Sequence, residues 1–483
     1  MLLLFKKTLP LSRDLGALTF LKITFFLSLV CNLSSVTFVH SSFERDIVML
    51  PFVRQVVDIS ASGNVFFILF EPDLLDFTND KITLSMEIHC PSSSEKFSVE
   101  LKHLPLLIEI LRETVFIKEN KVFVWNWKDF ISYVNFHLNK LIEFKGFVFD
   151  LAIAESYFFE KLDKPSSFNE VMSRFKKIKN DSDWEKFYNI YKEIYYPLLS
   201  VVVPCIETTP LLDYEAKKRV YSFYQINGQD NGRMLCSNVR VHGFNPHTLS
   251  KEQKDNFKPC VPFNLFLGFD FKSMEVAVLA HLANDEALLE LMDAKDIYSS
   301  IFQKITNSSI TDANSRNVAK KIFLPTIYGM SAKTIAEQAK IDYPFAEQIC
   351  KNINTIFFKS TKYVKEFVTL AESHGIVSDY FGKRRKFTEN FYKARNFCIQ
   401  SPASLICLEK LVELWKITHD KTRICYHVHD GYYVYATNEN WKEIVMDAKR
   451  VLVSESKICP GLRLRVTCQV GAKLNTMKSL EKR

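Results

Sequence analysis

The sequence predicts a mixed α/β (α+β) protein with more than one domain. The chain has 483 residues, 47% of them are hydrophobic, and runs typical of β-strands alternate with helical runs from residue 43 onward. A chain of this length and apolar content buries large cores and usually divides into domains. The net charge of +8 permits a polyanionic partner but also fits an ordinary soluble protein, so charge alone assigns no function.

Residues 1–42 differ from the rest of the chain. The basic residues Lys6, Lys7 and Arg13 precede an apolar stretch, an order that resembles a signal or an organelle-targeting sequence. Lys22 interrupts this stretch, and the uninterrupted part is shorter than the ~20 residues that span a bilayer. A targeting segment and a buried or dispensable extension both remain open, and no stable membrane insertion is expected.

Residues 43–197 have the pattern of an α/β domain. The runs VFFILF, KVFVWNW and GFVFDLAIA predict strands, and the polar segment KKIKNDSDWEK is a candidate domain boundary. Asn, Gly and Pro recur from Leu199 to Asn264 and predict loops there. Eleven cysteines without a CxxC pair indicate a reducing compartment and no zinc site.

The pattern sharpens after residue 264. FNLFLGFDF predicts a buried strand, KSMEVAVLAHLANDEALLELMD and ANSRNVAKKIFL predict helices, and one or two further helices are expected up to Gly375. Asp270 stands at the end of the strand, just before a helix. A carboxylate in that position suits metal binding or catalysis, but aspartate is also a common helix N-cap, so both interpretations remain open.

The helix that contains Arg316 carries functional residue types at a spacing of four. Arg316, Lys320, Leu324 and Tyr328 therefore share one face. An isolated helix slightly disfavours the like-charge pair of Arg316 and Lys320, but an anion would stabilise it. A basic face exposed to solvent is the alternative.

The stretch YHVHDGYYVYA predicts a β-hairpin with His429 and Asp430 at its tip. Asp430 and Gly431 are expected at the two turn positions, because a two-residue turn of this kind needs positive φ at both. A plain structural turn and a functional carboxylate both fit this pattern.

Three of these segments, in this order, resemble the three motifs of family A DNA polymerases, the family of bacterial DNA polymerase I. The segment that begins DFKSME resembles motif A and its following helix, RNVAKKIFLPTIYGMS resembles motif B, and HVHDG resembles motif C. NGRMLCS is similar to the segment before motif A, and GKRRKF and NFCIQSPAS are similar to segments between motifs B and C. The resemblance runs from about Gly232 to the C-terminus.

The resemblance implies a right-hand polymerase that copies a DNA template onto a primer from deoxyribonucleoside triphosphates. Palm and fingers are expected in residues 264–483, with the fingers at about 286–385, and a reduced thumb and the start of the palm in residues 198–263. A vestigial ribonuclease H-like exonuclease domain is expected in residues 43–197.

The resemblance also implies a role for each matching residue. Two Mg²⁺ ions would be held by Asp270, Asp430 and the backbone carbonyl of Phe271, since hard oxygen ligands suit Mg²⁺ and phosphoryl transfer depends on charge neutralisation. Arg316 and Lys320 would bind the triphosphate.

Other residues would select the nucleotide and hold the DNA. Tyr328 would stack near the template base and the sugar, and Glu275 would act as the sugar-selecting carboxylate, held against Tyr328. The residues expected to touch the primer–template are Arg233, Asn396 and Gln400 in the minor groove and His429 at the primer terminus.

Four departures from the family pattern bear on efficiency. Leu324 stands where an aromatic residue usually packs on the nucleotide, and Pro325 replaces a glycine, so a kink is expected. Gly431 replaces an acidic residue, and Tyr392 stands where a basic residue is expected. A non-catalytic nucleic-acid-binding remnant is therefore one alternative. A single-subunit RNA polymerase is another, against which Glu275 argues.

The N-terminal half resembles the family weakly. WNWKDF and FVFDLAIAESYFF are similar to the middle of the proofreading exonuclease, but there is no Asp-x-Glu on an early strand and no Tyr-x-x-x-Asp before Leu199. Asp129 and Asp150 are therefore expected to be structural, and proofreading is not expected. The short thumb predicts low processivity without a partner, and a monomer is expected. An organelle, a plasmid or a virus could provide the genome, in replication or repair.

Overall fold

The computed structural model of the chain describes residues 65–70, 83–89, 94–100, 103–118, 120–144, 146–159, 163–237, 245–250, 252–308 and 313–480. The segment 1–42, with its expected targeting role, lies outside these residues. The chain divides into two compact units, residues 1–152 with 163–177 and residues 153–162 with 178–483. One division, after Lys177, falls within the polar segment 176–186.

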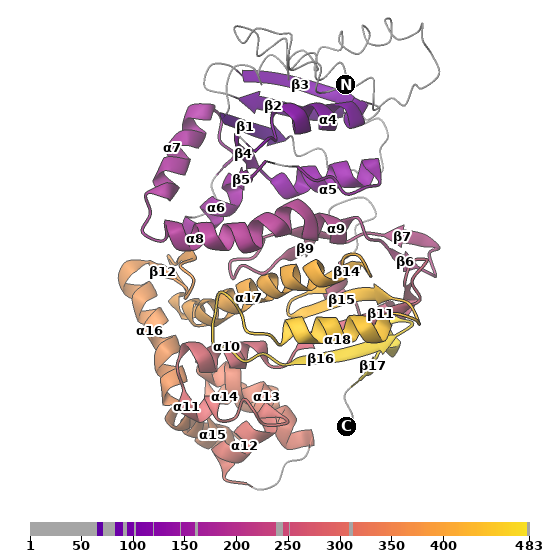
Figure 1. Ribbon diagram of the computed structural model, residues 1–483. Helices are drawn as coiled ribbons and strands as arrows, with labels where there is room; N and C mark the ends of the chain where they lie inside the picture. Colours follow the sequence, from indigo (N-terminus) through magenta and orange to yellow (C-terminus); the bar gives the residue numbers. More distant parts are fainter. Residues whose placement is uncertain are drawn as a thin grey trace, which may run out of the picture. The chain divides into compact units, whose positions relative to one another are not determined.

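The first unit is an α/β domain on a five-stranded sheet of order β3-β2-β1-β4-β5 (Figure 1). The first three strands are antiparallel neighbours, and β1, β4 and β5 run parallel. Central strand β1 is an unbroken apolar run whose Phe66, Phe67 and Ile68 are fully buried, as in strands covered on both faces. The elements are β1 (Val65–Phe70), β2 (Thr83–His89), β3 (Ser94–Glu100), α4 (Leu104–Thr114), β4 (Lys121–Trp125), α5 (Trp127–Leu138), β5 (Val148–Asp150) and α7 (Phe168–Lys179).

The run GFVFDLAIA is a strand only as far as Asp150, and α6 (Leu151–Phe158) begins at the next residue. Asp150 accepts hydrogen bonds from the backbone N–H groups of Ala152 at 3.0 Å and Trp127 at 2.8 Å. A carboxylate that satisfies a free N–H at this point favours the start of a helix over a longer strand. The strand predicted over the second half of this run is therefore wrong.

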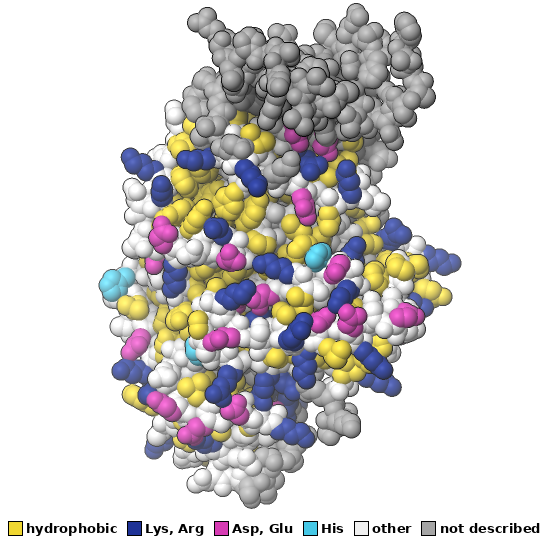
Figure 2. All heavy atoms as spheres, in the orientation of Figure 1, with side chains coloured by type: hydrophobic (Ala, Val, Ile, Leu, Met, Phe, Trp, Pro, Cys, Tyr) yellow, Lys and Arg dark blue, Asp and Glu magenta, His cyan; other side chains and the backbone are white. Residues whose placement is uncertain are grey.

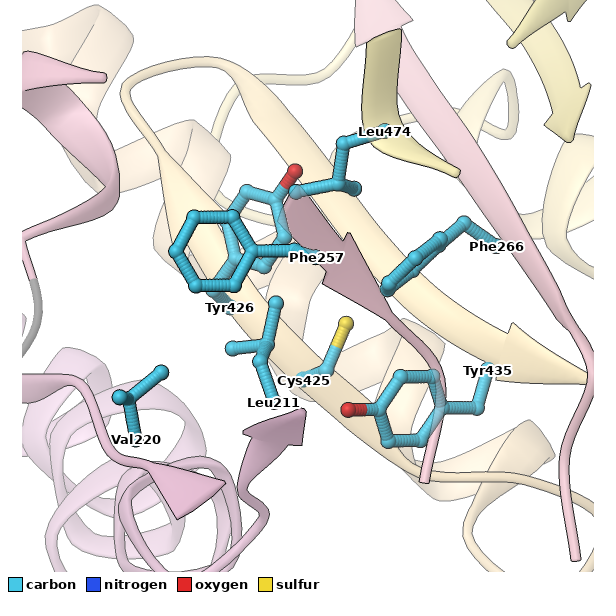
Figure 3. Packing of buried hydrophobic residues seen from close by; sticks show 8 residues of the cluster. All are labelled: Leu211, Val220, Phe257, Phe266, Cys425, Tyr426, Tyr435 and Leu474. Atoms are coloured by element: carbon cyan, nitrogen blue, oxygen red, sulfur yellow. The ribbon is translucent and has the colours of Figure 1, made fainter. Parts of the chain in front are cut away.

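The second unit is built on an antiparallel sheet of β14 (Ile424–Val428), β15 (Gly431–Ala436), β11 (Leu265–Phe271), β16 (Val466–Gly471) and β17 (Lys478–Ser479), in that spatial order. Helix α18 (Trp441–Leu452) packs on β11 and β16. The hydroxyl of Tyr432 on β15 donates to the Cys407 carbonyl of α17 (Ala394–Thr418) at 2.7 Å. A buried cluster joins this sheet to the small sheet β10-β6-β7, and Figure 3 shows its side chains. Its members are Leu211, Val220, Phe257, Phe266, Cys425, Tyr426, Tyr435 and Leu474. The mixed α/β fold class is thereby confirmed.

Helices make up most of the chain between β11 and the hairpin, with the short strand pair β12-β13 near its end, and α11 to α15 gather at one end of the second unit (Figure 1). The predicted helix KSMEVAVLAHLANDEALLELMD is wrong as a single element, since it divides into α10 and α11. Asn284 adopts φ +47°, and the buried Asp285 caps α11 by accepting from the Leu288 N–H. Ser360 also donates to Asp285 through its backbone N–H and its hydroxyl. Asn and Asp compete with helical hydrogen bonds in this way.

The predicted hairpin is present, but its turn is one residue earlier than expected. Val428 pairs with Gly431, so His429 and Asp430 form the turn, and the positive φ of +53° falls on His429. Gly431 is already in β15, where it pairs with Asp270 of β11. Pairing with the central strand thus extends β15 by one residue, and histidine is among the residues that tolerate the left-handed region.

Each cysteine that the structure describes carries a free thiol. In the described part of the chain, no helix is long and apolar enough to cross a membrane. Basic and acidic side chains are interspersed over the face seen in Figure 2.

The elements of the second unit, in chain order, are α8 (Trp184–Ile190), η4 (Tyr191–Tyr195), η5 (Leu198–Val202), α9 (Val203–Glu207), β6 (Leu211–Asp213), β7 (Lys218–Val220), β8 (Phe223–Gln225), β9 (Leu235–Ser237), η6 (Pro246–Thr248), η7 (Gln253–Asn256), β10 (Phe257–Lys258), β11 (Leu265–Phe271), α10 (Met274–Leu282), α11 (Glu286–Leu289), α12 (Ile297–Thr306), α13 (Ala313–Ile327), α14 (Ala332–Ala339), α15 (Tyr343–Ile356), α16 (Phe358–His374), β12 (Ile376–Ser378), β13 (Arg384–Lys386), η8 (Phe391–Lys393), α17 (Ala394–Thr418), β14 (Ile424–Val428), β15 (Gly431–Ala436), α18 (Trp441–Leu452), β16 (Val466–Gly471), η9 (Leu474–Thr476) and β17 (Lys478–Ser479).

Candidate active site

Asp270 and Asp430 enter the same cleft from neighbouring parts of the sheet. Asp270 is exposed at the end of β11, directly after four buried residues, and Asp430 lies in the hairpin turn. The backbone N–H of Phe271 donates to the Asp430 carbonyl at 3.2 Å, which fixes the two segments side by side. Both carboxylates and Phe271 line a cleft of about 720 Å³.

The charged groups of this cleft shift the pKa of Asp270 in opposite directions. Partial removal from water and the like charge of Asp430 raise the pKa of Asp270 to about 6, although Lys320 acts in the opposite direction. Partial burial also raises the pKa of Asp430. Two carboxylates that each disfavour ionisation of the other make a place where a cation is stabilising.

The oxygen donors fit a divalent cation. Of the carboxylates that line the cleft, Glu275 and Asp296 already accept hydrogen bonds from Tyr328, Arg233 and Arg316, which leaves Asp270, Asp430 and backbone oxygen for a cation. Among the described residues no group of three or more His, Cys, Asp or Glu side chains could hold a metal. Mg²⁺ is commonly bound through one or two carboxylates, with water and substrate phosphates completing its shell. The donor set therefore suits Mg²⁺ better than a metal that needs a full protein cage.

Helix α13 supplies two of the basic side chains that line the cleft. Arg316, Lys320 and Leu324 all line it, as their spacing of four predicts for one helix face. Lys320 is exposed, and Nε of Arg316 donates to Asp296 Oδ1 at 3.0 Å. Pro325 lies in the last turn of α13, and the kink expected there stays a prediction.

Glu275, on the first turn of α10, connects this cleft to three other predicted site residues. Its Oε2 accepts from the Tyr328 hydroxyl at 2.7 Å. Its Oε1 accepts from Arg233 Nη2 at 2.8 Å and from Gln400 Nε2 at 3.3 Å. Burial and the charge of Glu275 raise the pKa of Tyr328 well above its usual value, so the phenol stays protonated and donates. The expected contact between Glu275 and Tyr328 is present.

Asn396 does not reach the Glu275 group. It lines a separate open groove of about 520 Å³ together with Gln400 and Tyr392, all on one side of α17 and the turn before it. Gln400 links the groove to the Glu275 group. Its Oε1 accepts from Nδ2 of Asn231, another groove residue, at 3.1 Å, and its Nε2 donates to Glu275. Tyr392 is exposed and uncharged, and Arg385 and Lys393 supply the basic side chains of this groove.

His429 is exposed beside the cleft rather than among its lining residues. Its ring lies 5.0 Å from that of His247, measured between ring centroids. Partial burial lowers the pKa of His429, with Arg233 acting in the same direction. The imidazole is therefore neutral at pH 7 and can serve as a hydrogen-bonding or stacking group.

The cleft also contains residues that sequence reasoning missed. Arg465 and Gln469 come from β16 and the segment before it, and Asp296 and Tyr298 stand at the start of α12. For Asp296 a local signal existed, because Asp-Ile-Tyr-Ser is a typical helix start with an N-cap aspartate. Nothing local indicates that this cap faces Arg316, 20 residues further along the chain.

Comparison with known proteins defines the class of this fold and site. Residues 169–476 match DNA polymerase family A, which is more than half of the chain, so the chain belongs to that family. DNA polymerase I of Chloroflexus aurantiacus is 24% identical over 241 residues, covering 47% of this chain and 26% of that protein. DNA polymerase I of Borreliella burgdorferi is 26% identical over 294 residues, covering 54% of this chain and 30% of that protein.

A solved structure extends the likeness of the fold. The polymerase domain of Pol1 from M. smegmatis, solved in complex with DNA primer–template and dNTP, matches with a TM-score of 0.67 and covers 88% of this chain and 99% of that one. The identity is 12%, so this likeness concerns the fold alone. The chain spans less than a third of the length of the two DNA polymerase I proteins named above.

Proposed function

We propose that the chain is a DNA-directed DNA polymerase that extends a primer on a DNA template. The observation that carries the proposal is a single cleft, in a member of family A, that combines Asp270 and Asp430 with Arg316 and Lys320. The DNA primer–template and dNTP of the similar M. smegmatis structure support these as the partners of this chain.

The cleft suits phosphoryl transfer because this reaction depends on positioning and charge neutralisation. Two Mg²⁺ ions held by Asp270, Asp430 and the Phe271 carbonyl would neutralise charge on the attacking and leaving oxygens. Arg316 and Lys320 bind the triphosphate, one helical turn apart on the same face of α13. Leu324, on the next turn, borders the nucleotide where other members of the family carry an aromatic ring.

Glu275 selects the sugar in this proposal. Its carboxylate accepts hydrogen bonds from Tyr328, Arg233 and Gln400. These bonds hold it in place, so it cannot move aside for an added 2′-hydroxyl. A ribonucleotide would collide with this carboxylate or disrupt its hydrogen bonds, which rejects it more strongly than pocket shape alone. The same network favours a DNA polymerase over the RNA polymerase alternative.

The primer–template runs along the groove beside this network. Asn396 and Gln400 line it and contact the minor groove, Arg233, which shares Glu275 Oε1 with Gln400, joins them, and His429 meets the primer terminus. The sheet of β11 and β14–β17 acts as the palm, and residues of about 286–385 act as the fingers. Short helices, the three-stranded sheet β10-β6-β7 and the pair β8-β9 in residues 198–263 form a reduced thumb, so a processivity partner is part of the proposal.

The first unit does not proofread in this proposal. Asp150 is buried and both of its oxygens accept backbone N–H groups, and Asp129 pairs with Lys128 at 2.5 Å. Neither carboxylate offers a free cation site. Labelled single strands incubated with Mg²⁺ should therefore stay intact, and shortening that disappears in Asp150→Asn would contradict this.

Primer extension with Mg²⁺ tests the main proposal, with deoxyribonucleotides and ribonucleotides supplied in parallel. Asp270→Asn and Asp430→Asn should each reduce extension by about 10²-fold or more, because removing stabilisation of transition-state charge has effects of that order. DNA affinity should change little, since it comes mainly from cationic contacts to phosphates. Asp293→Asn, an exposed carboxylate paired with Arg463, serves as the control and should retain activity.

The same assay separates the alternatives. A wild-type chain that binds the duplex but extends nothing would be a non-catalytic remnant. Equal use of both sugars would favour the RNA polymerase and remove the assigned role of Glu275.

A further inference from the structure

Asp296 connects the start of one fingers helix to the triphosphate-binding face of another. It is the N-cap of α12, and its Oδ2 accepts from the Ser299 backbone N–H at 3.1 Å and from the Ser299 hydroxyl at 2.5 Å. Its other oxygen, Oδ1, accepts from Nε of Arg316 on α13 at 3.0 Å. One carboxylate therefore caps a helix and holds an arginine at the same time.

The atoms used in this pair decide what it can do. Arg316 offers Nε to Asp296, and neither Nη group has a hydrogen-bond partner among the described residues. The two Nη groups are part of the fork that recognises phosphate oxygens. The contact with Asp296 thus restrains the guanidinium and leaves its phosphate-binding edge available.

The surroundings keep both partners in place. Tyr298 is buried and lies two residues after Asp296, with its ring centroid 5.9 Å from Cζ of Arg316. Asp296, Tyr298 and Arg316 all line the cleft of Asp270 and Lys320. Both hydrogen bonds from Ser299 hold Asp296 without any contribution from Arg316. The position of the carboxylate therefore does not depend on the arginine.

We propose that Asp296 is a positioning residue that orients Arg316 toward the triphosphate of the incoming nucleotide. This inference rests on the proposed function and adds to it a residue that acts through Arg316. An arginine that is already ordered loses less conformational entropy when it binds its ligand. The opposite role, a latch that competes with the triphosphate, would require Asp296 to occupy the Nη groups, and it does not.

The expected effect is on nucleotide binding. Ordering one long side chain costs an amount equivalent to about a 2- to 10-fold change in affinity. Asp296→Asn and Asp296→Ser should therefore raise KM for deoxyribonucleotide by about 2- to 10-fold and change kcat by less than about 2-fold. Asn and Ser are good N-caps, so both variants keep the start of α12 while losing the charged partner of Arg316.

Two controls separate positioning from helix capping. Asp293→Asn removes a carboxylate three residues away whose ion pair with Arg463 is 72–73% exposed, and KM should not change. In an Arg316→Ala background, Asp296→Asn should have no further effect on KM, because its route of action is gone. Thermal unfolding of each variant reports on the cap, and Asp296→Asn should melt within about 2 °C of wild type.

Each outcome is decisive. An unchanged KM in Asp296→Asn, or an equal rise in the Arg316→Ala background, would overturn the positioning role, and a lowered KM would establish the latch instead. A wild-type chain that extends no primer would contradict the proposed function. The pair would then be tested by equilibrium binding of a deoxyribonucleoside triphosphate to the complex with a dideoxy-terminated primer, where Asp296→Asn should still weaken binding.

Discussion

Lys320 and Arg316 stand one turn apart on α13, but their surroundings give them different roles. Arg316 is held by Asp296, whereas Lys320 has no ion-pair partner among the described residues. The charge of Lys320 acts directly on Asp270, whose pKa it lowers against the effects of burial and of Asp430. Under the proposed function, Lys320 would therefore compensate negative charge during the reaction.

Lys320→Ala should raise KM for nucleotide and lower kcat, by about 10²-fold in kcat/KM, because a cation on the triphosphate contributes to binding and to stabilisation of developing charge. Lys321→Ala is the matched control. Lys321 is the next residue of the same helix, equally exposed, but it does not line the cleft. Steady-state primer extension measures kcat/KM of both variants. Similar losses of kcat/KM in the two would show that Lys320 belongs to an ordinary exposed basic face and has no specific role.

His427, three residues before Asp430, should make the stability of the protein depend on pH. It is buried, and burial lowers its pKa to about 3, with His247 acting in the same direction. In the unfolded chain the pKa is about 6.5, so between these values the unfolded state binds more protons. The stability contributed by neutral His427 is present above pH 6.5 and is lost as the pH falls.

Between pH 7 and pH 5 this loss amounts to about 2 kcal/mol. The ring centroids of His427 and Tyr432 are 5.4 Å apart. His427→Phe keeps a ring that can stack on Tyr432 but does not titrate. Urea unfolding at the two pH values should show wild type losing about 2 kcal/mol more free energy of unfolding than the variant. Identical losses would mean that His427 gains its proton without unfolding.

At the scale of elements, the sequence predicts those features that depend on neighbouring residues. The strand that ends near Asp270 and the shared helix face of Arg316 and Lys320 follow from spacing within one element. The hairpin turn was predicted one residue too late, because pairing of β15 with β11 decides the register and turn propensity does not. The break at Asn284 depends on Ser360, 75 residues beyond Asp285 along the chain, to which no local pattern refers.

The turn after α13 offers a test of how elements fit together. Gly329 adopts φ +82°, and a Cβ on it would lie 1.5 Å from Nη1 of Arg395 on α17. Gly461 has nearly the same φ, +81°, but its nearest neighbour would be 3.4 Å away. Gly461→Ala should cost about 1–2 kcal/mol from backbone strain alone. Gly329→Ala should cost about 1 kcal/mol more, because the guanidinium must move.

Denaturant unfolding of both variants, alone and with Arg395→Ala, measures this difference. In the Arg395→Ala background the extra cost at Gly329 should disappear, since the obstructing group is absent. An extra cost that persists would show that the strain at Gly329 comes from the backbone and not from α17.

Across the whole molecule, the candidate active site consists of contacts between segments that are distant along the chain. Glu275 and Tyr328 are 53 residues apart, Arg233 and Glu275 are 42 apart, and Gln400 and Glu275 are 125 apart. Spacing can place each residue on an element, but only packing brings the elements together. The family resemblance led to the expected contact of Glu275 with Tyr328, whereas the bonds of Glu275 to Arg233 and Gln400 and the position of Asp296 were missed.

The second unit also takes a segment from earlier in the chain, since residues 153–162 belong to it. Tyr157 of this segment is fully buried, its ring lies 4.7 Å from that of Phe187, and its hydroxyl donates to the Phe381 carbonyl at 2.5 Å. A fragment of residues 178–483 would leave this space empty and the carbonyl without its donor. Loss of a large buried aromatic side chain typically costs about 3–5 kcal/mol.

A fragment of residues 151–483 should therefore unfold at a clearly higher urea concentration than one of residues 178–483. Tyr157→Ala in the longer fragment should lower its midpoint part of the way to that of the shorter one, because the buried Phe158, whose ring lies 5.0 Å from that of Phe187, also packs in this segment. Tyr157→Phe keeps the ring and removes only the hydroxyl, so it should cost about 1–3 kcal/mol. Equal midpoints for the two fragments would show that residues 153–162 are not needed by the second unit, and its boundary would then lie at residue 178.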